Sequence, residues 1–168
     1  RFIGKVNAPQ GLTVYDSYEN GGTPGDNGNM CIIKNSKNVT LEGIGDDAEI
    51  DGWGFSFYVG ENYPNRESYE VRNLTFRRYP EDALGFQGYQ AQSGVMHTTI
   101  ERVWVHNCSF YPGYCENPKE SDKKEGDGSC DFKRGQYYTM DYNYYNGCHK
   151  TNLVGANSKN MQYNMTFH

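Results

Sequence analysis

The chain has 168 residues, which fits one domain that is long enough to bury a core. Its formal charge is −5, whereas nucleic-acid-binding proteins usually carry an excess of basic residues. No apolar run is long enough to span a membrane. Aromatic residues make up 15% of the chain and 20 residues are glycine, a composition that favours many short strands joined by turns over long helices.

Short strand-like segments follow one another along the chain, several of them ending in glycine. The first, residues 1–6, has neither a signal peptide nor an initiator methionine before it, so we expect a fragment or a processed product. Hydrophobic and turn signals predict further strands, in chain order, at 38–45, 48–54, 54–60, 68–76, 82–88, 100–110, 130–135, 137–145, 151–155 and 164–168. The polar stretch 111–128 reads as a loop.

Three of these segments share an internal pattern that places Asn73, Asn107 and Asn143 at matching positions. Such a recurrence indicates a solenoid of short parallel strands, in which the asparagines stack and hydrogen-bond along the axis. The alternative is an antiparallel sandwich with asparagines in ordinary turns. The solenoid is favoured because Asn-Gly hairpin turns between neighbouring strands are few.

Asparagines and cysteines are the residues with potential for covalent modification. The odd number of cysteines, five, and the lack of a C-x-x-C pair argue against a metal-thiolate site. Cys108 and Cys115 can close a small loop in an oxidising compartment, but we expect buried free thiols for most of the five. The glycosylation pattern N-x-S/T begins or interrupts a strand wherever it occurs, so we interpret it as structural at Asn38, Asn73, Asn107 and Asn164.

Asp127 and Asp131 stand four residues apart. Along a straight strand they would lie about 13 Å apart, too far to share one ion, so we expect the backbone to bend at Gly128. Alternation turns Asp131 outward, and Asp82, one strand earlier, is then its lateral neighbour. Three converging carboxylates repel one another unless a cation joins them, and an all-oxygen ligand set suits Ca²⁺. The alternative is three unrelated, solvated turn residues.

Lys150 begins the strand that follows the acidic trio. It is placed to hold an anionic substrate there, although a solvated lysine is the common alternative. His106 and His149 have no spacing that indicates a metal site or a nucleophile dyad, and no serine lies in a G-x-S-x-G context.

With these segments in place, the chain resembles the pectate lyase family of polysaccharide lyases. The matching stretches are DALGFQG, IERVWVHNCSF, DGSCDFKRGQYYTMDYNYYNGCHKTNLVG and NMTFH, in the family's order and spacing, and NVTLEGIGDDAEIDGWGF resembles the strands that precede them. The resemblance covers nearly the whole chain. It implies an all-β fold, a right-handed single-stranded parallel β-helix truncated at both ends, with residues 1–168 forming one domain.

The family's calcium aspartates fall on Asp82, Asp127 and Asp131, and its substrate-binding lysine falls on Lys150. The resemblance therefore implies a secreted, extracellular enzyme of pectin degradation, which uses Ca²⁺ to cleave de-esterified pectin, or polygalacturonate, by β-elimination. Calcium would bridge protein and substrate carboxylates while a base removes the C5 proton. We expect a monomer whose partner is this acidic polysaccharide, with neither nucleic acid nor membrane as partner. The open ends of the β-helix are the surfaces through which copies of the chain can associate.

The family's base is an arginine in an R-x-P segment that would follow the position of His168. We therefore expect the 168 residues alone to be poorly active. Arg78 and Arg134 do not match the position of that base.

Two further departures concern the neighbourhood of the site. His106 and Asn107 replace the family's usual Asp-His pair, a motif that is largely structural. Pro80 occupies the position of an additional acidic ligand found in some relatives, for which Glu81 is a stand-in.

Other functions are compatible with the same residues. One is a β-helix glycoside hydrolase that uses the three aspartates as acid and base, although a paired Asp-Asp with a downstream Gly-His-Gly is not seen. Another is a non-catalytic β-helix that binds acidic glycans through calcium. Pectin lyases replace the calcium aspartates by basic residues, so the presence of all three favours the unesterified substrate.

Overall fold

The structure is a computed structural model that describes residues 1–8, 30–60, 63, 67–88, 100–115, 124–155 and 162–168. It is all-β, because these residues form thirteen strands and no α-helix. Every strand pairing among them is parallel, which contradicts the antiparallel alternative. Within the described ranges there is no helix with the length and apolar character needed to cross a membrane.

The strands pair in three parallel ladders, which we call A, B and C. Ladder A contains β1 (Phe2–Asn7), residues 43–51 of β3 (Val39–Asp51), β6 (Thr75–Arg77), β9 (Ser109–Phe110) and β11 (Tyr144–Tyr145). Ladder B contains β2 (Met30–Lys34), β4 (Gly54–Val59), β7 (Leu84–Gly88), residues 128–134 of β10 (Gly128–Asp141) and β12 (Lys150–Val154). Ladder C contains residues 39–42 of β3, β5 (Glu67–Arg72), β8 (Ile100–His106), residues 135–141 of β10 and β13 (Gln162–Phe167).

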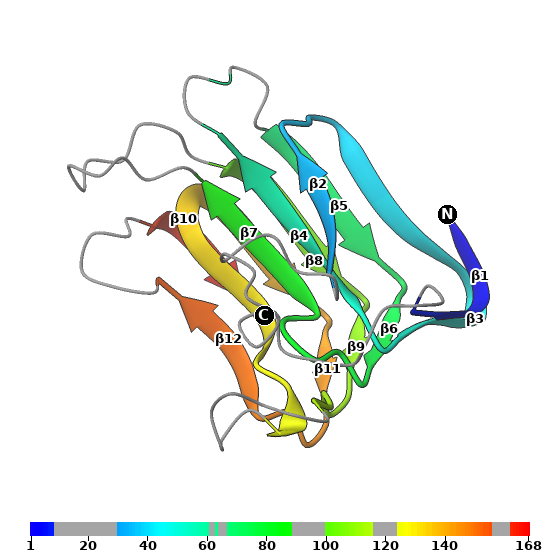
Figure 1. The fold of residues 1–168 in the computed structure, drawn as a ribbon. Coiled ribbons are helices and arrows are strands. Elements are labelled where there is room, and N and C mark those ends of the chain that lie inside the picture. Colours follow the sequence, from blue (N-terminus) through cyan, green and yellow to red (C-terminus); the bar gives the residue numbers. More distant parts are fainter. Residues whose placement is uncertain (9–29, 61–62, 64–66, 89–99, 116–123, 156–161) are drawn as a thin grey trace.

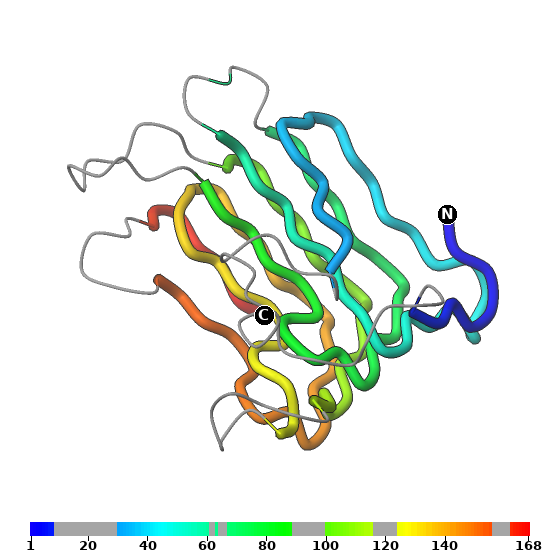
Figure 2. Tube along the Cα trace, viewed as in Figure 1, coloured from blue at the N-terminus to red at the C-terminus, as the bar shows by residue number. Residues whose placement is uncertain are grey.

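After β1, the chain visits these ladders in the repeating order B, C, A. Figure 1 shows β4, β7 and β10 side by side, with β1 at one edge of the molecule. The tube in Figure 2 follows the same course, each passage lying next to the previous one. Segments about 30 residues apart in the sequence are therefore neighbours in space, as the recurrence of strand-like segments predicts.

Two stacks of aromatic rings fill the interior. In ladder B, Phe86 is fully buried between Phe57 and Phe132, with centroids 4.8 Å and 5.5 Å away and planes within 7° of parallel. A second stack in ladder A consists of Phe76, Phe110 and Tyr145. Both stacks follow from the register, because residues paired across a parallel ladder point to the same side.

The strand predictions are largely confirmed. Two expected pairs of neighbouring strands are continuous in the structure: residues 39–51 form β3 and residues 128–141 form β10. Strand β2 was not predicted. Of the 111–128 loop, residues 116–123 lie outside the described residues.

The corner between ladders C and A differs from the prediction. Asn73 and Asn107 follow β5 and β8 with φ values of 54° and 51°, in the left-handed region. The matching position after β10 holds Tyr142, with φ 52°, and not Asn143. Asn143 lies one place later, where its Oδ1 accepts a hydrogen bond from the Cys108 N–H at 3.0 Å and its Nδ2 donates to a carbonyl of β8 at 2.8 Å. The predicted hydrogen bonding between strands is thus confirmed for Asn143, while its predicted position is wrong by one residue.

The tyrosine at this corner leads to a stability prediction. A side chain with a Cβ is strained in the left-handed region, which asparagine tolerates better, and Tyr142 is 79% exposed. Tyr142→Asn is therefore expected to raise the free energy of unfolding by about 1 kcal/mol, measured by urea denaturation. As a control, Tyr144→Asn changes an exposed tyrosine within β11 and is not expected to stabilise the protein. Equal effects of both substitutions would contradict strain as the cause.

The structure shows where the cysteines and the asparagines of the N-x-S/T pattern lie and how their backbone is arranged. All five cysteines are free thiols, and Cys108, Cys115 and Cys130 are buried, so the expected free thiols are confirmed. Every asparagine of the N-x-S/T pattern has a φ between 51° and 54°, namely Asn38, Asn73, Asn107 and Asn164. Asparagine is favoured at such positions for conformational reasons alone.

Candidate functional site

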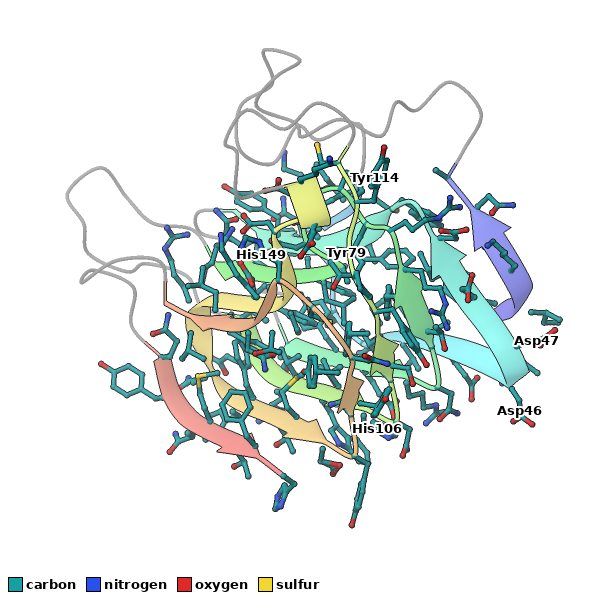
Figure 3. All side chains as sticks on the ribbon, turned by 90° about the horizontal axis from the view of Figure 1, so that it is seen from below. Asp46, Asp47, Tyr79, His106, Tyr114 and His149 are labelled. Carbon is teal, nitrogen blue, oxygen red and sulfur yellow. The ribbon has the colours of Figure 1, made fainter. Side chains whose placement is uncertain are left out.

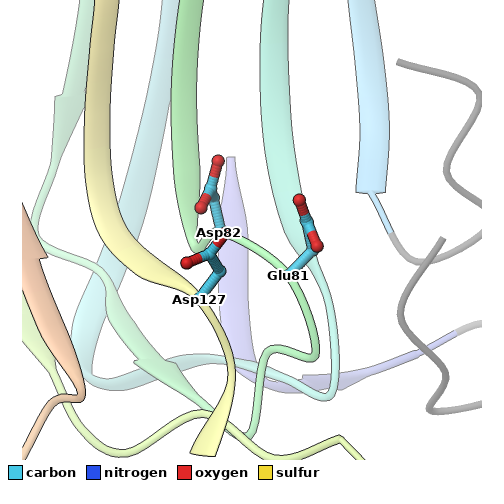
Figure 4. Close-up of side chains that lie close together, drawn as sticks. All are labelled: Glu81, Asp82 and Asp127. Carbon is cyan, nitrogen blue, oxygen red and sulfur yellow. The ribbon is translucent and has the colours of Figure 1, made fainter. Parts of the chain in front are cut away.

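Three carboxylates come together beside ladder B. Glu81 and Asp82 lie shortly before β7, separated from it by Ala83, and Asp127 directly precedes β10. One ligand oxygen of each lies within 4.8 Å of the others. In Figure 4 the carboxylates of Asp82 and Asp127 lie next to each other and that of Glu81 stands to one side. We call these three residues, together with Asp131, the acidic cluster.

Backbone pairing holds the two carboxylate-bearing segments together. The Asp127 N–H donates to the Glu81 carbonyl at 3.1 Å, and the Ala83 N–H donates to the Gly128 carbonyl at 3.0 Å. The Asp82 side chain is fixed as well, because its Oδ1 accepts the Gly128 N–H at 2.9 Å. The segments therefore enter ladder B with their acidic residues already adjacent.

Asp131 joins the cluster from within β10, by a route that differs from the one expected. Its register partner on β7 is Gly85 and not Asp82. Asp82 Oδ2 lies beside the backbone of Gly85, where an added Cβ would be 3.6 Å away, an ordinary contact. The expected bend lies one residue before Gly128, at Asp127, and Gly128 itself begins β10. Gly126, with φ 77°, is the left-handed residue nearby.

Gly128 is required for a different reason, which is close approach of the carboxylates. A Cβ at this position would lie 2.1 Å from Asp131 Oδ1 and 3.0 Å from Asp82 Oδ1. The two carboxylates thus meet over the bare backbone of Gly128. Any side chain at residue 128 would push them apart.

The cluster is shielded from solvent. Glu81, Asp82 and Asp131 are only 7%, 4% and 3% exposed. Burial, together with the charges of Asp82 and Asp127, raises the pKa of Asp131 to about 8, although Lys133 opposes the shift. Among the described residues, no donor satisfies Asp131 Oδ1, which is inaccessible to solvent. Buried carboxylates with such a deficit of positive charge are suited to a cation.

Two lysines flank the cluster. Lys150 begins β12, next to Gly128 in the register, and its Nζ donates to Asp127 Oδ1 at 2.7 Å. The predicted position of Lys150 beside the acidic residues is thus confirmed. Lys133 was not singled out from the sequence. Its Nζ lies 3.9 Å from Asp82 Oδ2 and 4.0 Å from Asp131 Oδ2.

The sequence pattern that could have identified Lys133 is the alternation of side chains along a strand. Asp131 and Lys133 are two residues apart on β10, so both side chains leave the same face. Burial disfavours the charged form of Lys133, but the neighbouring carboxylates, Asp82 foremost, outweigh this and raise its pKa. Lys133 is therefore a charged member of the site.

The remaining candidate residues are engaged elsewhere. His106 lies 3.0 Å from Glu70, and His149 lies 3.2 Å from the carbonyl of Gly126. The two histidines are well separated in Figure 3. Arg78 binds the buried carboxylate of Asp51, and Arg134 donates to the Gly88 carbonyl at 2.8 Å. These contacts give no reason to assign a catalytic role to Arg78 or Arg134.

The donor set is suited to a hard divalent cation, of which Ca²⁺ is one. One carboxylate oxygen each of Glu81, Asp82 and Asp127 lies within 4.8 Å of the others, close enough for all three to reach one ion. The cluster offers carboxylate oxygens and neither histidine nitrogen nor thiolate, a set that disfavours zinc and copper. Glu81, Asp82, Asp127 and Asp131 are thus the residues that would hold such an ion.

Comparison of the chain with family models, with curated proteins and with solved structures found no match. The chemistry of the site therefore rests on its own residues. They form a buried anionic cluster with two cationic side chains at its margin, which can bind a dication and then an anionic ligand.

Proposed function

We propose that this protein binds Ca²⁺ at the acidic cluster and acts as a pectate lyase, cleaving polygalacturonate by β-elimination. The observation that carries the proposal is the convergence of four carboxylates with Lys133 and Lys150 beside them. A bound dication and the two lysines together would balance the four carboxylates, which removes the repulsion of a polyanionic ligand and leaves the dication to attract its carboxylate groups.

The fold that belongs to this proposal is a right-handed single-stranded parallel β-helix, formed by residues 1–168 as one domain. It is supported by the repeating passage through ladders B, C and A and by the aromatic stacks between successive strands. A secreted, extracellular location belongs to the same proposal, since pectin is an extracellular polymer.

The roles of the chain's own residues follow from their contacts. Bound Ca²⁺ would supply Lewis acidity toward the carboxylate of the substrate. The Lys150 side chain is 43% exposed and is placed to exchange its contact with Asp127 for one with that carboxylate. Lys133 holds positive charge between Asp82 and Asp131, where it would stabilise negative charge developing on the sugar.

The alternatives differ in what the carboxylates do. In a glycoside hydrolase, two carboxyl groups act across the scissile bond and stand about 6.5–9.5 Å apart in inverting enzymes and about 5–5.5 Å apart in retaining enzymes. One oxygen each of Glu81, Asp82 and Asp127 lies within 4.8 Å of the others, which is closer than the inverting arrangement, and the dependence of activity on calcium separates a shared cation from the retaining arrangement. A non-catalytic β-helix that binds acidic polysaccharide through calcium shares every feature of the site and differs only in turnover.

One assay separates the three functions. The chain is incubated with polygalacturonate in CaCl₂ or in EDTA, while ultraviolet absorbance of the unsaturated product and reducing ends are followed. Calcium-dependent absorbance identifies the lyase, and its rate is expected to be low, because no described residue is assigned as the base that removes the C5 proton. Reducing ends formed in EDTA without absorbance would identify a hydrolase, and calcium-dependent binding without turnover would identify a binding module. Binding that is indifferent to calcium would refute the metal site. Asp46→Asn serves as a control, because Asp46 is exposed and lies near the β1 end (Figure 3).

Replacing Lys150 is expected to change the affinity for Ca²⁺ and the affinity for polygalacturonate in opposite directions. Its ammonium group neutralises Asp127, so it competes with a cation for that carboxylate. Lys150→Met is expected to raise Ca²⁺ affinity about fivefold, or about 1 kcal/mol for a partly screened charge, and to weaken calcium-dependent binding of polygalacturonate. Isothermal titration calorimetry measures both affinities.

The matched control is Lys37→Met, which removes an exposed lysine outside the acidic cluster. It should change neither affinity by more than about twofold, the scale expected for a distant, screened charge. A fall in Ca²⁺ affinity on replacing Lys150 would contradict the assigned competition.

A further inference from the structure

A second group of exposed side chains lies on the outward face of ladder C. Trp104 on β8 is 44% exposed and Tyr137 on β10 is 50% exposed. Both line a surface hollow of about 430 Å³, whose other walls are Arg102, Val103, Thr139 and Asp141. Large exposed aromatic rings around a hollow with polar walls are typical of a binding surface.

Trp104 is held in a fixed orientation. The imidazole of His106 stacks on its indole, with ring centroids 3.8 Å apart and planes 20° from parallel. The indole Nε1 donates to Asp141 Oδ2 at 3.3 Å. Because His106 follows two residues later on the same strand, the other indole face turns toward Arg102 and the hollow. An aromatic face that is already immobilised loses little entropy on binding.

The backbone beneath the hollow is strained. Four neighbouring strands of ladder C carry a residue with positive φ at the same register position. These residues, with φ of 71°, 56°, 59° and 53°, are Ser68, Arg102, Tyr137 and Asn164. Arginine and tyrosine are unfavourable there compared with glycine or asparagine, and both line the hollow. The positive φ recurs along ladder C, and Arg102 and Tyr137 are the two residues that both carry it and line the hollow.

The charges around the hollow favour an uncharged ligand. Arg102 Nη1 donates to Glu67 at 2.7 Å, so its positive charge is compensated. Among the lining residues, this leaves the carboxylate of Asp141, which repels a polyanion. Asp141 Oδ1 is inaccessible to solvent, so the hydroxyl of Thr139 is the polar group that the hollow offers to a ligand. This hydroxyl can exchange hydrogen bonds with the hydroxyl groups of a ligand.

We infer that this hollow binds a neutral pyranose ring of a polysaccharide. The apolar face of the sugar would lie on Trp104, with the Tyr137 ring beside it and hydroxyl groups toward Thr139. The site is separate from the acidic cluster, since residues 135–141 of β10 belong to ladder C and residues 128–134 to ladder B. Its ligand also differs in charge from the polygalacturonate proposed for the cluster.

The fluorescence of Trp104 can report binding at the hollow. The chain has two tryptophans, so Trp53→Phe leaves Trp104 as the only one. This variant is titrated in EDTA with soluble xylan, β-glucan, galactan and polygalacturonate, so that the acidic cluster holds no cation. A saturable change in emission is expected with at least one neutral polysaccharide and not with polygalacturonate. No change with all three neutral polymers, or a preference for polygalacturonate, overturns the inference.

Two tyrosine variants form a matched pair. Tyr137→Asn and Tyr142→Asn each replace an exposed tyrosine in the left-handed region, and only Tyr137 lines the hollow. Both variants are expected to fold with unchanged or higher melting temperatures. Only Tyr137→Asn should weaken binding of the neutral polysaccharide, by about tenfold in calorimetry, and Trp104→Ala should abolish it. Equal affinities of the two tyrosine variants would refute the assignment. Calcium binding should be the same in both, because it is a property of the other site.

Discussion

Replacing Asp131 by asparagine is expected to stabilise the metal-free protein at pH 8 and to remove most of the stabilisation that Ca²⁺ gives to the parent chain. Asp131 is buried beside Asp82, and this raises its pKa to about 8. Near pH 8 the native state must therefore accommodate a buried negative charge next to another carboxylate. Asparagine has the same shape without that charge, so the gain should be about 1–3 kcal/mol.

The sign of the pH dependence follows from proton binding. An unfolded aspartate loses its proton near pH 3.9, whereas folded Asp131 holds its proton up to about pH 8. Between these values the native state binds more protons, so the contribution of Asp131 to stability is lost as pH rises from about 4 to about 8. Lys133 opposes the loss, and a bound cation would reverse it.

Thermal unfolding at pH 5, 6.5 and 8, in EDTA or CaCl₂, measures these effects. In EDTA, the melting temperature of the parent chain should fall as pH rises, and CaCl₂ should restore it. Each kcal/mol of free energy of unfolding corresponds to about 2–4 °C in melting temperature. Asp131→Asn should show a flatter pH profile and little response to calcium. Asp46→Asn, at an exposed position, should behave as the parent chain does. A loss of stability at pH 8 in EDTA on replacing Asp131 would contradict the assigned charge repulsion.

Truncation of Phe86 is expected to have the largest effect on stability. This fully buried ring stacks on Phe57 and Phe132 from neighbouring strands of ladder B. Phe86→Ala removes buried apolar surface and leaves a cavity bordered by both rings, which should cost about 3–5 kcal/mol. The free energy of unfolding from urea denaturation measures the loss.

Phe86→Leu is the control, because it keeps most of the buried volume and should cost clearly less than the alanine variant. Tyr114→Ala, at a 43% exposed ring, should change stability by about 0.5 kcal/mol or less. A cost of about 1 kcal/mol or less for Phe86→Ala would show that the stack is not a continuous core.

The strand pattern around the site could be read from the sequence because side chains alternate locally. In β10, Cys130 and Phe132 are fully buried in the core, while Asp131 and Lys133 leave the opposite face, as alternation predicts. The proximity of Asp82, Asp127 and Lys150 was also predicted, since each lies near the start of a strand in the recurring series. These inferences need only a period of two and a regular order of strands.

Left-handed positions were harder to predict. The recurring pattern predicted that Asn73, Asn107 and Asn143 occupy matching positions, without predicting their backbone conformation. Asn73 and Asn107 are left-handed, whereas the third left-handed residue is Tyr142, whose side chain gives no indication of positive φ. Tyr137 and Arg102 escaped notice for the same reason.

The sequence by itself determined the all-β character, the approximate strands and the acidic residues that lie near one another. Only the tertiary structure decided that Asp131 pairs with Gly85, that Glu81 belongs to the acidic cluster and Lys133 flanks it, and that Trp104 and Tyr137 border one hollow. Alternation and turn preference act within a few residues and can be read locally. Register between strands about 30 residues apart depends on how whole segments pack, and a shift by one residue turns every side chain to the other face.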